Sequence, residues 1–241
     1  IGQMLIEKMG RIPAVTHISS EFRNSDTVIN PKAIYLAVSQ SGETADTISA
    51  IKEIKLKGGQ VFGVVNVVGS TIARLCGKGV YIHSGPEQSV ASTKAFTNMV
   101  AALTIFATQL GRTRHLSKDE GRELMQALQQ TPHLMETYLE DIGPIDEAVN
   151  LLCEANSVLF LGRGLSATVA KEGALKLMEL AYIPCLAYPA GEMKHGPIAL
   201  LEEGSPVVVI APNDHLKEKT MSALHEVKAR GAKVILIHEQ G

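Results

Sequence analysis

Along this chain, short runs of apolar residues alternate with longer segments in which apolar side chains return every three or four positions. Residues 34–39 and 61–65 form two such runs, and the segment between them has the periodicity of a helix that ends at Gly58-Gly59. A strand, a helix and a second strand in this order predict a βαβ unit, whose parallel strands need helices on both faces. The pattern therefore predicts an α/β fold.

The same pattern returns in residues 207–239, which align with residues 34–66 without a gap. The matching pairs are Ile34 with Val207, Ala50 with Ala223, Gly58 with Gly231 and Val61 with Val234. An upstream stretch at Ile12-Pro13 also matches Ile183-Pro184, but only the later copy has a strand and a glycine turn before it. The later copy has no counterpart of residues 85–111. We therefore expect two related Rossmann-like domains, each a parallel sheet flanked by helices, the first truncated at its N-terminus and the second at its C-terminus.

The alignment of the two copies leaves a more charged, helical stretch between them. We predict a partial first domain at residues 1–112, connecting helices at 113–144 and a partial second domain at 145–241. Pro132 and Pro144 should divide the middle stretch, and Ser117-Lys118-Asp119-Glu120 resembles a helix start. The alternative that these helices belong to the second domain stays open.

Composition and charge exclude several classes of protein. The formal net charge is −2 and only 4% of the residues are aromatic, without any Trp, so the sequence does not predict binding to nucleic acid or to an anionic membrane. No apolar run is long enough to span a bilayer, and the start has no signal-peptide pattern. Cys76, Cys153 and Cys185 form no metal-spaced pair, and their odd number favours a reduced, cytoplasmic setting.

The polar loop Ser39-Gln40-Ser41-Gly42-Glu43-Thr44 follows a predicted strand and precedes a predicted helix. Main-chain N–H groups and the positive end of the helix dipole favour an anion there, and the hydroxyl and amide side chains add donors that suit a phosphate. Capping of the helix by Ser39 or Ser41 is the simpler interpretation. The matching loop in the second copy, residues 212–217, has lost the hydroxyl cluster, which favours phosphate binding over a role in folding alone.

Two further loops carry weaker signals. Ser89-Val90-Ala91-Ser92-Thr93-Lys94 also precedes an apolar helix, and capping by Ser92 or Thr93 accounts for its composition. Residues 162–167 fit the loose G-x-G-x-x-A form of a dinucleotide-binding turn. The acidic residue expected at the end of the next strand is not evident, so we interpret this segment as a tight turn.

Three charged residues interrupt the apolar helix predicted for residues 168–182. Glu172, Lys176 and Glu179 stand at i, i+4 and i+7 and therefore share one narrow stripe. A solvated helix edge with a Glu–Lys pair is one interpretation, and a cleft in which a Glu acts as a general base beside a Lys is the other. His195 follows in a loop bounded by glycines and a proline, where it is either an exposed histidine or an acid–base group.

Taken together, these groups match the requirements of aldose–ketose interconversion. That reaction needs an anchor for a phosphate, an acid–base group that opens the sugar ring, and a carboxylate that moves a proton between neighbouring carbons.

Four motifs also resemble one known family: SQSGETADT (39–47), VASTKAFT (90–97), EGALKLME (172–179) and AGEMKHGPIAL (190–200). They are similar to the isomerase half of the glutamine–fructose-6-phosphate aminotransferases, within the wider sugar isomerase (SIS) domain family. The resemblance implies two SIS domains, a cytoplasmic homodimer, and amination and isomerisation of fructose 6-phosphate to glucosamine 6-phosphate with ammonia from glutamine.

The resemblance also implies roles for individual residues. The phosphate ligands of the family fall on Ser39, Gln40, Ser41 and Thr44, and Val90 and Ser92 match positions that contact the sugar. Glu179 matches the carboxylate that moves a proton between C1 and C2, with Lys176 and Glu172 beside it. His195 matches the ring-opening histidine, which reaches in from the partner subunit in this family. Neither a metal nor an organic cofactor is implied.

Three parts of the family are not found in this sequence: the glutaminase domain with its N-terminal Cys, a Cys-Gly-Thr-Ser loop, and a C-terminal tail with a Schiff-base lysine. We therefore expect the chain alone to be inactive. The alternatives are a non-catalytic SIS regulator that binds a sugar phosphate and a deglycase of fructosamine 6-phosphates. A dinucleotide-dependent oxidoreductase is the remaining, weaker alternative.

Overall fold

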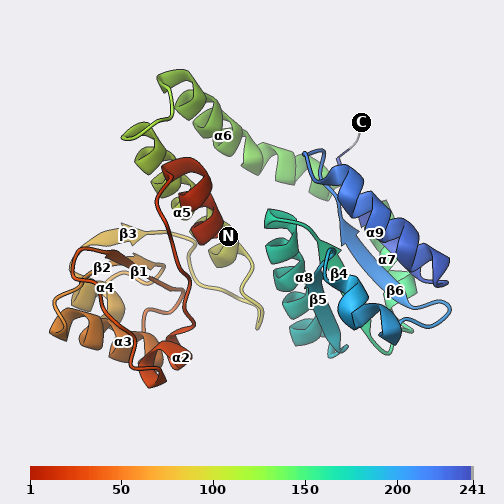
Figure 1. Ribbon diagram of the computed structural model, residues 1–241, viewed down its shortest axis with the longest axis horizontal. Helices are drawn as coiled ribbons and strands as arrows, with labels where there is room; N and C mark the ends of the chain where they lie inside the picture. The colour runs from red at the N-terminus through yellow and green to blue at the C-terminus, as the bar shows by residue number, and fades with distance from the viewer. Residues whose placement is uncertain (240–241) are drawn as a thin grey trace. The chain divides into compact units, whose positions relative to one another are not determined.

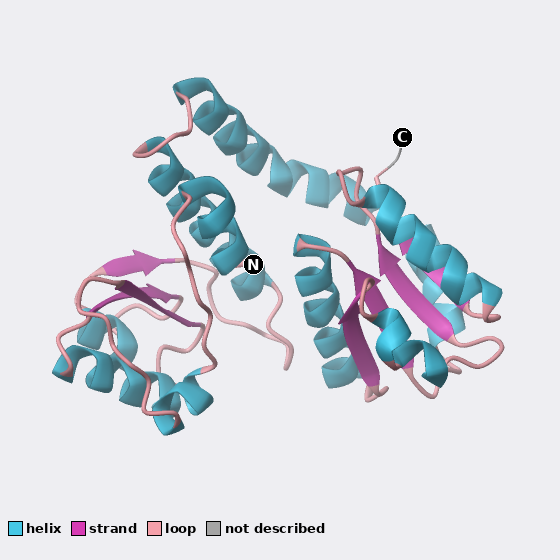
Figure 2. Cartoon of the chain, viewed as in Figure 1, coloured by secondary structure: helices cyan, strands magenta, loops and turns pink. Residues whose placement is uncertain are grey.

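The computed structural model describes residues 1–239, which divide into two compact units (Figures 1 and 2). The N-terminal unit comprises residues 2–129, and the C-terminal unit begins at residue 130. Each unit contains one parallel sheet with helices packed on it, so the predicted α/β fold is confirmed. Within residues 1–239, we find no helix whose length and hydropathy would let it span a bilayer.

The N-terminal unit is built on a three-stranded sheet in the order β1-β2-β3. Its elements are α1 (Gly2–Leu5), the π-helix η1 (Ile6–Gly10), α2 (Ser19–Asn24), β1 (Ile34–Ser39), α3 (Ala45–Leu56), β2 (Gln60–Val65), α4 (Thr71–Cys76), β3 (Gly79–Tyr81) and α5 (Lys94–Arg112). In register, Ile34 lies opposite Gln60 and Gly63 lies opposite Gly79. Buried side chains of α3, among them Ile51 and Ile54, pack with those of the strands and α4.

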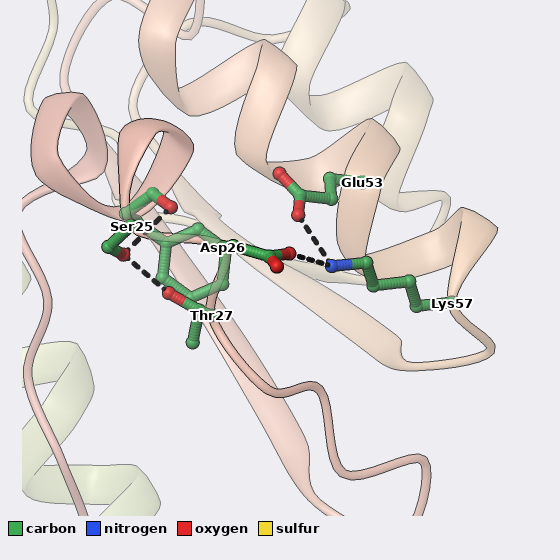
Figure 3. A network of polar contacts seen from close by, with 6 residues as sticks. Ser25, Asp26, Thr27, Glu53 and Lys57 are labelled. Atoms are coloured by element: carbon green, nitrogen blue, oxygen red, sulfur yellow. Dashed lines mark hydrogen bonds and ion pairs between the residues drawn. The ribbon is translucent and has the colours of Figure 1, made fainter.

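A charged network joins the end of α3 to the turn after α2 (Figure 3). The ammonium group of Lys57 lies 2.9 Å from Glu53, one turn earlier on α3, and 3.1 Å from Asp26. Hydrogen bonds to Glu53 and then to Asp26 raise the pKa of Lys57, although burial acts in the opposite direction. Beside it, the hydroxyls of Ser25 and Thr27 lie 2.8 Å apart. These contacts hold the chain entering β1 against the end of α3.

The C-terminal unit has a four-stranded sheet in the order β5-β4-β6-β7. Its elements are α7 (Gly143–Leu152), β4 (Val158–Gly162), α8 (Leu165–Ala181), β5 (Cys185–Pro189), the 3₁₀ turns η2 (Met193–His195) and η3 (Pro197–Leu200), β6 (Pro206–Ile210), α9 (Lys217–Ala229) and β7 (Lys233–Ile237). Alternate residues of β4 enter two separate cores. Leu159 and Leu161 pack with α9, whereas Val158 and Phe160 pack with α8, as expected for a parallel sheet covered on both faces.

The predicted repeat is confirmed in the two sheets. β1, α3 and β2 form a βαβ unit with parallel strands, and β6, α9 and β7 form the same unit at the aligned positions. The upstream match is incomplete. Residues 183–189 include β5, which pairs with β4, whereas residues 1–33 of the structure contain no strand. β5 bonds to β4, whereas the sheet described in the N-terminal unit, β1-β2-β3, has no strand in the place of β4. The residues around Ile12-Pro13 therefore have no neighbour for the backbone groups of a strand.

Helix α6 (Lys118–Glu140) contains the boundary between the two units, which falls between Gln129 and Gln130. Its predicted start is confirmed as a capping box. Ser117 Oγ accepts the Glu120 N–H at 3.2 Å, and the Glu120 carboxylate accepts the Ser117 N–H at 2.7 Å. The predicted break at Pro132 is wrong, because α6 continues through it to Glu140. Pro132 removes one backbone donor and crowds the carbonyl four residues earlier, but helical residues on both sides of it continue the helix.

Candidate active site

The Ser39–Thr44 loop lies in the N-terminal unit, between the carboxyl end of β1 and the start of α3. Ser39 is buried, and its hydroxyl accepts the Gly42 N–H at 3.0 Å. The hydroxyl of Ser41 accepts the Glu43 N–H at 3.2 Å. Each hydroxyl thus helps to shape the loop and retains its own proton for donation to another group.

The interpretation of Ser39 or Ser41 as a cap of α3 is wrong. The N-cap of α3 is Thr44, and among residues 1–239 no side chain caps this helix. Both serines bond to amides inside the loop instead, which leaves the first turn of α3 open to another acceptor. Gln40, whose amide was also expected at the phosphate, is half-buried at the end of β1.

Gly42 is the one residue of the Ser39–Thr44 loop with a left-handed backbone. Its φ is +69°, a conformation that side chains with a Cβ rarely adopt. A Cβ placed there would lie 2.0 Å from Ser70 Oγ and 2.9 Å from Val65 Cγ1. Both the backbone angle and the surroundings therefore require glycine.

The loop also contacts the start of α4. The Glu43 carboxylate accepts the Thr71 N–H at 2.8 Å, and the Gly42 carbonyl accepts the Ile72 N–H at 2.9 Å. The backbone hydrogen bond from Thr71 is the main reason that the pKa of Glu43 lies below its usual value. Neither contact was evident from the sequence, because the partners stand 28 and 30 positions apart along the chain.

Asn66 is a second residue that the sequence analysis missed. It is buried at the end of β2, where its N–H donates to the Ser39 carbonyl at 3.4 Å. Its side chain accepts the Ser84 N–H at 2.8 Å and donates to the Gly85 carbonyl at 2.7 Å. Asn66 therefore ties the end of β1 to the segment that leads into residues 89–94. In the sequence, the signal that could have indicated Asn66 is a polar residue directly after an apolar strand.

In residues 89–94, Val90 is almost fully exposed and Ala91 is buried. The expected capping of α5 by Ser92 or Thr93 is wrong. The Glu87 carboxylate accepts the Ala95 N–H at 2.8 Å and lies 3.5 Å from the Ser92 hydroxyl. Both donors face the same carboxylate oxygen, Oε1, whose two lone pairs can accept from both, and the negative charge is favoured at the positive end of α5. Val90 and Ser92 therefore lie in the turn before α5, which begins at Lys94.

In the C-terminal unit, the structure brings Glu172, Lys176 and Glu179 together on α8. The Lys176 ammonium lies 2.6 Å from the Glu179 carboxylate and 3.4 Å from that of Glu172. The three side chains are 21–34% exposed, so this is a half-buried cluster and not a fully solvated helix edge. The i,i+4 Glu–Lys pair that the sequence predicted is present, and a second carboxylate, that of Glu179, shares the same ammonium.

Two opposing influences act on Lys176. Burial is the larger single one and acts to lower its pKa, but the hydrogen bond to Glu179 and the charges of both carboxylates together raise it above the usual value. Lys176 therefore stays an ammonium across the neutral range. Because its folded pKa is raised, the cluster stabilises the fold fully below the unfolded pKa and loses this contribution as the pH rises through the folded pKa.

We expect the pKa of Lys176 to fall in a Glu172→Gln/Glu179→Gln double variant, to below that of an exposed lysine, because burial then acts without the two carboxylates. NMR titration of the labelled lysine side chains measures this change. The single variant Glu179→Gln should lower the pKa more than Glu172→Gln, since Glu179 lies closer to the ammonium. An unchanged pKa in the double variant would contradict the described cluster.

The segment from Gly162 to Ala167 forms the predicted tight turn between β4 and α8. A Cβ on Gly162 would lie 2.5 Å from the backbone of Ser166, and Gly164 has a φ of +56°. The Gly162 carbonyl accepts the Ala190 N–H at 2.8 Å. A Cβ on Gly191 would lie 2.9 Å from the Arg163 guanidinium. The turn therefore packs directly against the loop that carries His195.

His195 ends the short 3₁₀ turn η2 and is exposed. The loop itself is anchored within that turn, because Met193 is fully buried in the core and Lys194 pairs with Glu226 of α9 at 3.0 Å. In residues 1–239, no hydrogen bond or ion pair joins His195 to Glu172, Lys176 or Glu179. The described residues also contain no group of three or more His, Cys, Asp or Glu side chains placed to hold a metal ion.

Both units contain a parallel sheet with helices packed on it, and the polar loop follows the first strand of the N-terminal unit. The family model for the SIS domain matches residues 1–109 and 151–241. The chain belongs to the SIS domain family.

Comparison with individual proteins narrows the similarity further. The chain is 46% identical, over all of its 241 residues, to a glutamine–fructose-6-phosphate aminotransferase (isomerizing) of Thermus thermophilus, and 45% identical to that of Chlorobaculum tepidum. It spans 40% and 39% of the length of these two relatives. The family resemblance expected from the motifs is thereby confirmed.

Solved structures agree with this placement. The C-terminal domain of glucosamine-fructose-6-phosphate aminotransferase from Francisella tularensis has a TM-score of 0.95 and 37% identity, and the match covers 98% of this chain and 68% of that one. A glucosamine-6-phosphate deaminase from Thermotoga maritima has a TM-score of 0.80 and 20% identity, with 98% of this chain and 70% of that one covered. At this lower identity, the second likeness shows the fold alone.

Proposed function

We propose that this chain is the isomerising part of a glutamine–fructose-6-phosphate aminotransferase, which converts fructose 6-phosphate and ammonia from glutamine to glucosamine 6-phosphate. The observation that carries the proposal is the half-buried cluster of Lys176 between Glu172 and Glu179. A carboxylate held beside an ammonium suits proton transfer at carbon, whereas simple binding of a sugar phosphate does not require it. The identity to the T. thermophilus relative of that name supports the same reaction.

The phosphate of the substrate is assigned to the loop before α3. The open N-terminus of that helix presents main-chain N–H groups, and the hydroxyls of Ser39, Ser41 and Thr44 can donate to phosphate oxygens. Gln40 adds an amide donor. Val90 and Ser92 are assigned to the sugar, in line with the family motif that they match.

Glu179 is assigned the transfer of a proton between C1 and C2 of the open-chain sugar. Lys176, an ammonium at neutral pH, holds the Glu179 carboxylate in place at 2.6 Å and is itself balanced by Glu172. His195 is assigned the opening of the sugar ring, for which its exposed position on an anchored loop leaves it accessible.

The proposed reaction also needs ammonia, and no residue of this chain is assigned its production. Because this chain spans 40% of the T. thermophilus relative, we assign the production of ammonia to a glutaminase domain of the same parent chain. The homodimer, the cytoplasmic location and the inactivity of the chain alone stay predictions from the family resemblance. The non-catalytic regulator and the deglycase stay alternatives, and the names of the relatives favour neither.

The phosphate assignment predicts the effect of removing two hydroxyls. A Ser41→Ala/Thr44→Ala variant should bind fructose 6-phosphate roughly 100-fold more weakly, because each hydrogen bond to a charged group contributes at least about 1.5 kcal/mol. Isothermal titration of the full-length protein measures this. Thr113→Ala, which removes an exposed hydroxyl at the end of α5, is the matched control and should leave the affinity unchanged. Equal affinities of the double variant and the wild type would reject the assignment.

A further inference from the structure

Glu43 stands in the middle of the loop to which the phosphate is assigned, between Gly42 and Thr44. A carboxylate close to a phosphate is repulsive, and nothing in anion binding itself calls for one. The residue therefore raises two physical questions: what offsets its charge, and what the side chain contributes at this place.

The structure answers the first question. The Glu43 carboxylate turns to the start of α4, where it accepts the Thr71 N–H at 2.8 Å. Thr71 is the first residue of α4, and its N–H is one of the donors that a helix leaves without an intrahelical partner. The positive end of the helix favours a negative charge at this position. The charge of Glu43 is thus offset by the start of α4.

Two more contacts fix the same part of the loop against α4. The Gly42 carbonyl accepts the Ile72 N–H at 2.9 Å, which uses the next free donor of the helix. Ser70, 4% exposed, lies so close to Gly42 that no side chain fits between them. The three consecutive residues Ser70, Thr71 and Ile72 therefore hold Gly42 and Glu43 in one position.

We propose that Glu43 is a positioning residue for the phosphate site: by binding the N-terminus of α4, it holds the Ser39–Thr44 loop in the shape that receives the phosphate. This inference rests on the proposed function, which places the phosphate in that loop. Glu43 makes no contact with the substrate in this scheme. It acts through the amides and hydroxyls of its neighbours, whose directions depend on the conformation of the loop.

The sign of the change in affinity separates this role from simple repulsion. If Glu43 acted only through its charge, Glu43→Ala would tighten the binding of fructose 6-phosphate. As a positioning residue, it should weaken binding, by about tenfold or more for the loss of one charge-assisted hydrogen bond. Inorganic phosphate should lose affinity by the same factor, because the effect is confined to the phosphate loop. Glu43→Gln, which keeps an acceptor oxygen, should retain part of the affinity.

Removing the donor provides an independent test that leaves Glu43 in place. Thr71→Pro eliminates the N–H, and proline is tolerated at the first position of a helix. The preceding Ser70 has φ −62° and ψ 163°, the extended conformation that a residue before proline prefers. Thr71→Val, which keeps the N–H, is the matched control for loss of the hydroxyl and should cost less affinity than Thr71→Pro.

The decisive experiment is isothermal titration of the full-length protein and its variants with fructose 6-phosphate and with inorganic phosphate, after thermal unfolding followed by circular dichroism has verified folding. Glu43→Ala and Thr71→Pro should each weaken binding of both ligands, and the double variant should be no weaker than the weaker single one. Unchanged or tighter binding in folded Glu43→Ala, or additive losses, would overturn the positioning role while leaving the proposed function intact. A folded wild type that binds neither ligand would reject the proposed function and, with it, this inference.

Discussion

A Glu179→Gln variant of the full-length protein should lose about 10²- to 10⁴-fold of its isomerisation rate, the usual contribution of a general acid–base group. The amide has nearly the same shape as the carboxylate but cannot take up a proton from carbon. Lys176 retains Glu172 as a charged partner at 3.4 Å, so the cluster loses one of its two carboxylates and the helix should remain folded. The affinity for fructose 6-phosphate should change little, because its phosphate is assigned to the Ser39–Thr44 loop.

Glu172→Gln is the matched control for this variant, because it removes a carboxylate from the same lysine on the same helix. Its effect on the rate should be much smaller, since Glu172 is assigned no proton transfer. The measurement is NMR detection of deuterium incorporation and product formation from fructose 6-phosphate, together with isothermal titration of the same samples. Equal losses in the two variants, or a Glu179→Gln variant with normal turnover, would reject the assignment of Glu179.

Gly42→Ala is expected to have the second large effect. The new side chain must adopt a φ of +69°, which costs about 1–2 kcal/mol, and must displace Ser70 and Val65, which costs about 1–3 kcal/mol more. We therefore expect the N-terminal unit to be destabilised by roughly 2–5 kcal/mol and the loop to lose its phosphate-binding shape. Denaturant unfolding followed by circular dichroism and titration with fructose 6-phosphate measure the two effects.

The chain offers a matched control in Gly69. This residue has a φ of +70°, but a Cβ there would meet no atom within 4 Å. Gly69→Ala should therefore cost only the backbone strain, about 1–2 kcal/mol, and leave binding of fructose 6-phosphate largely intact. If Gly42→Ala cost no more than Gly69→Ala, the close packing of the loop on Ser70 would be contradicted.

The parts of the candidate site that the sequence predicted are those defined by local spacing. Glu172, Lys176 and Glu179 were expected on one face of a helix because 3.6 residues per turn place positions i, i+4 and i+7 together, and the structure has Lys176 in contact with both carboxylates. The turn at residues 162–167 and the capping box at Ser117 were predicted on the same local basis. Each of these depends on residues within one or two helical turns of one another.

Two of the predictions that were wrong concern which group binds the start of a helix. Ser39 and Ser41 were candidates to cap α3, and Ser92 or Thr93 to cap α5, because hydroxyls before a helix usually do so. In the structure, the serines bond inside their loop, and Glu87 accepts the N–H at the start of α5. Several acceptors lie within reach of each donor, and the backbone conformation of the loop, which the sequence pattern does not define, selects between them.

By itself, the sequence determined the α/β class, the internal repeat and the family. Apolar periodicity and motif spacing are local properties, and they can be recognised without knowledge of the fold. Only the tertiary structure decided that the Glu172–Lys176–Glu179 cluster is half-buried, that Asn66 ties two loops together and that Glu43 binds the start of α4. The physical reason is the same in each case. Burial and long-range hydrogen bonds depend on which elements pack together, and the sheet brings residues into contact that stand far apart along the chain.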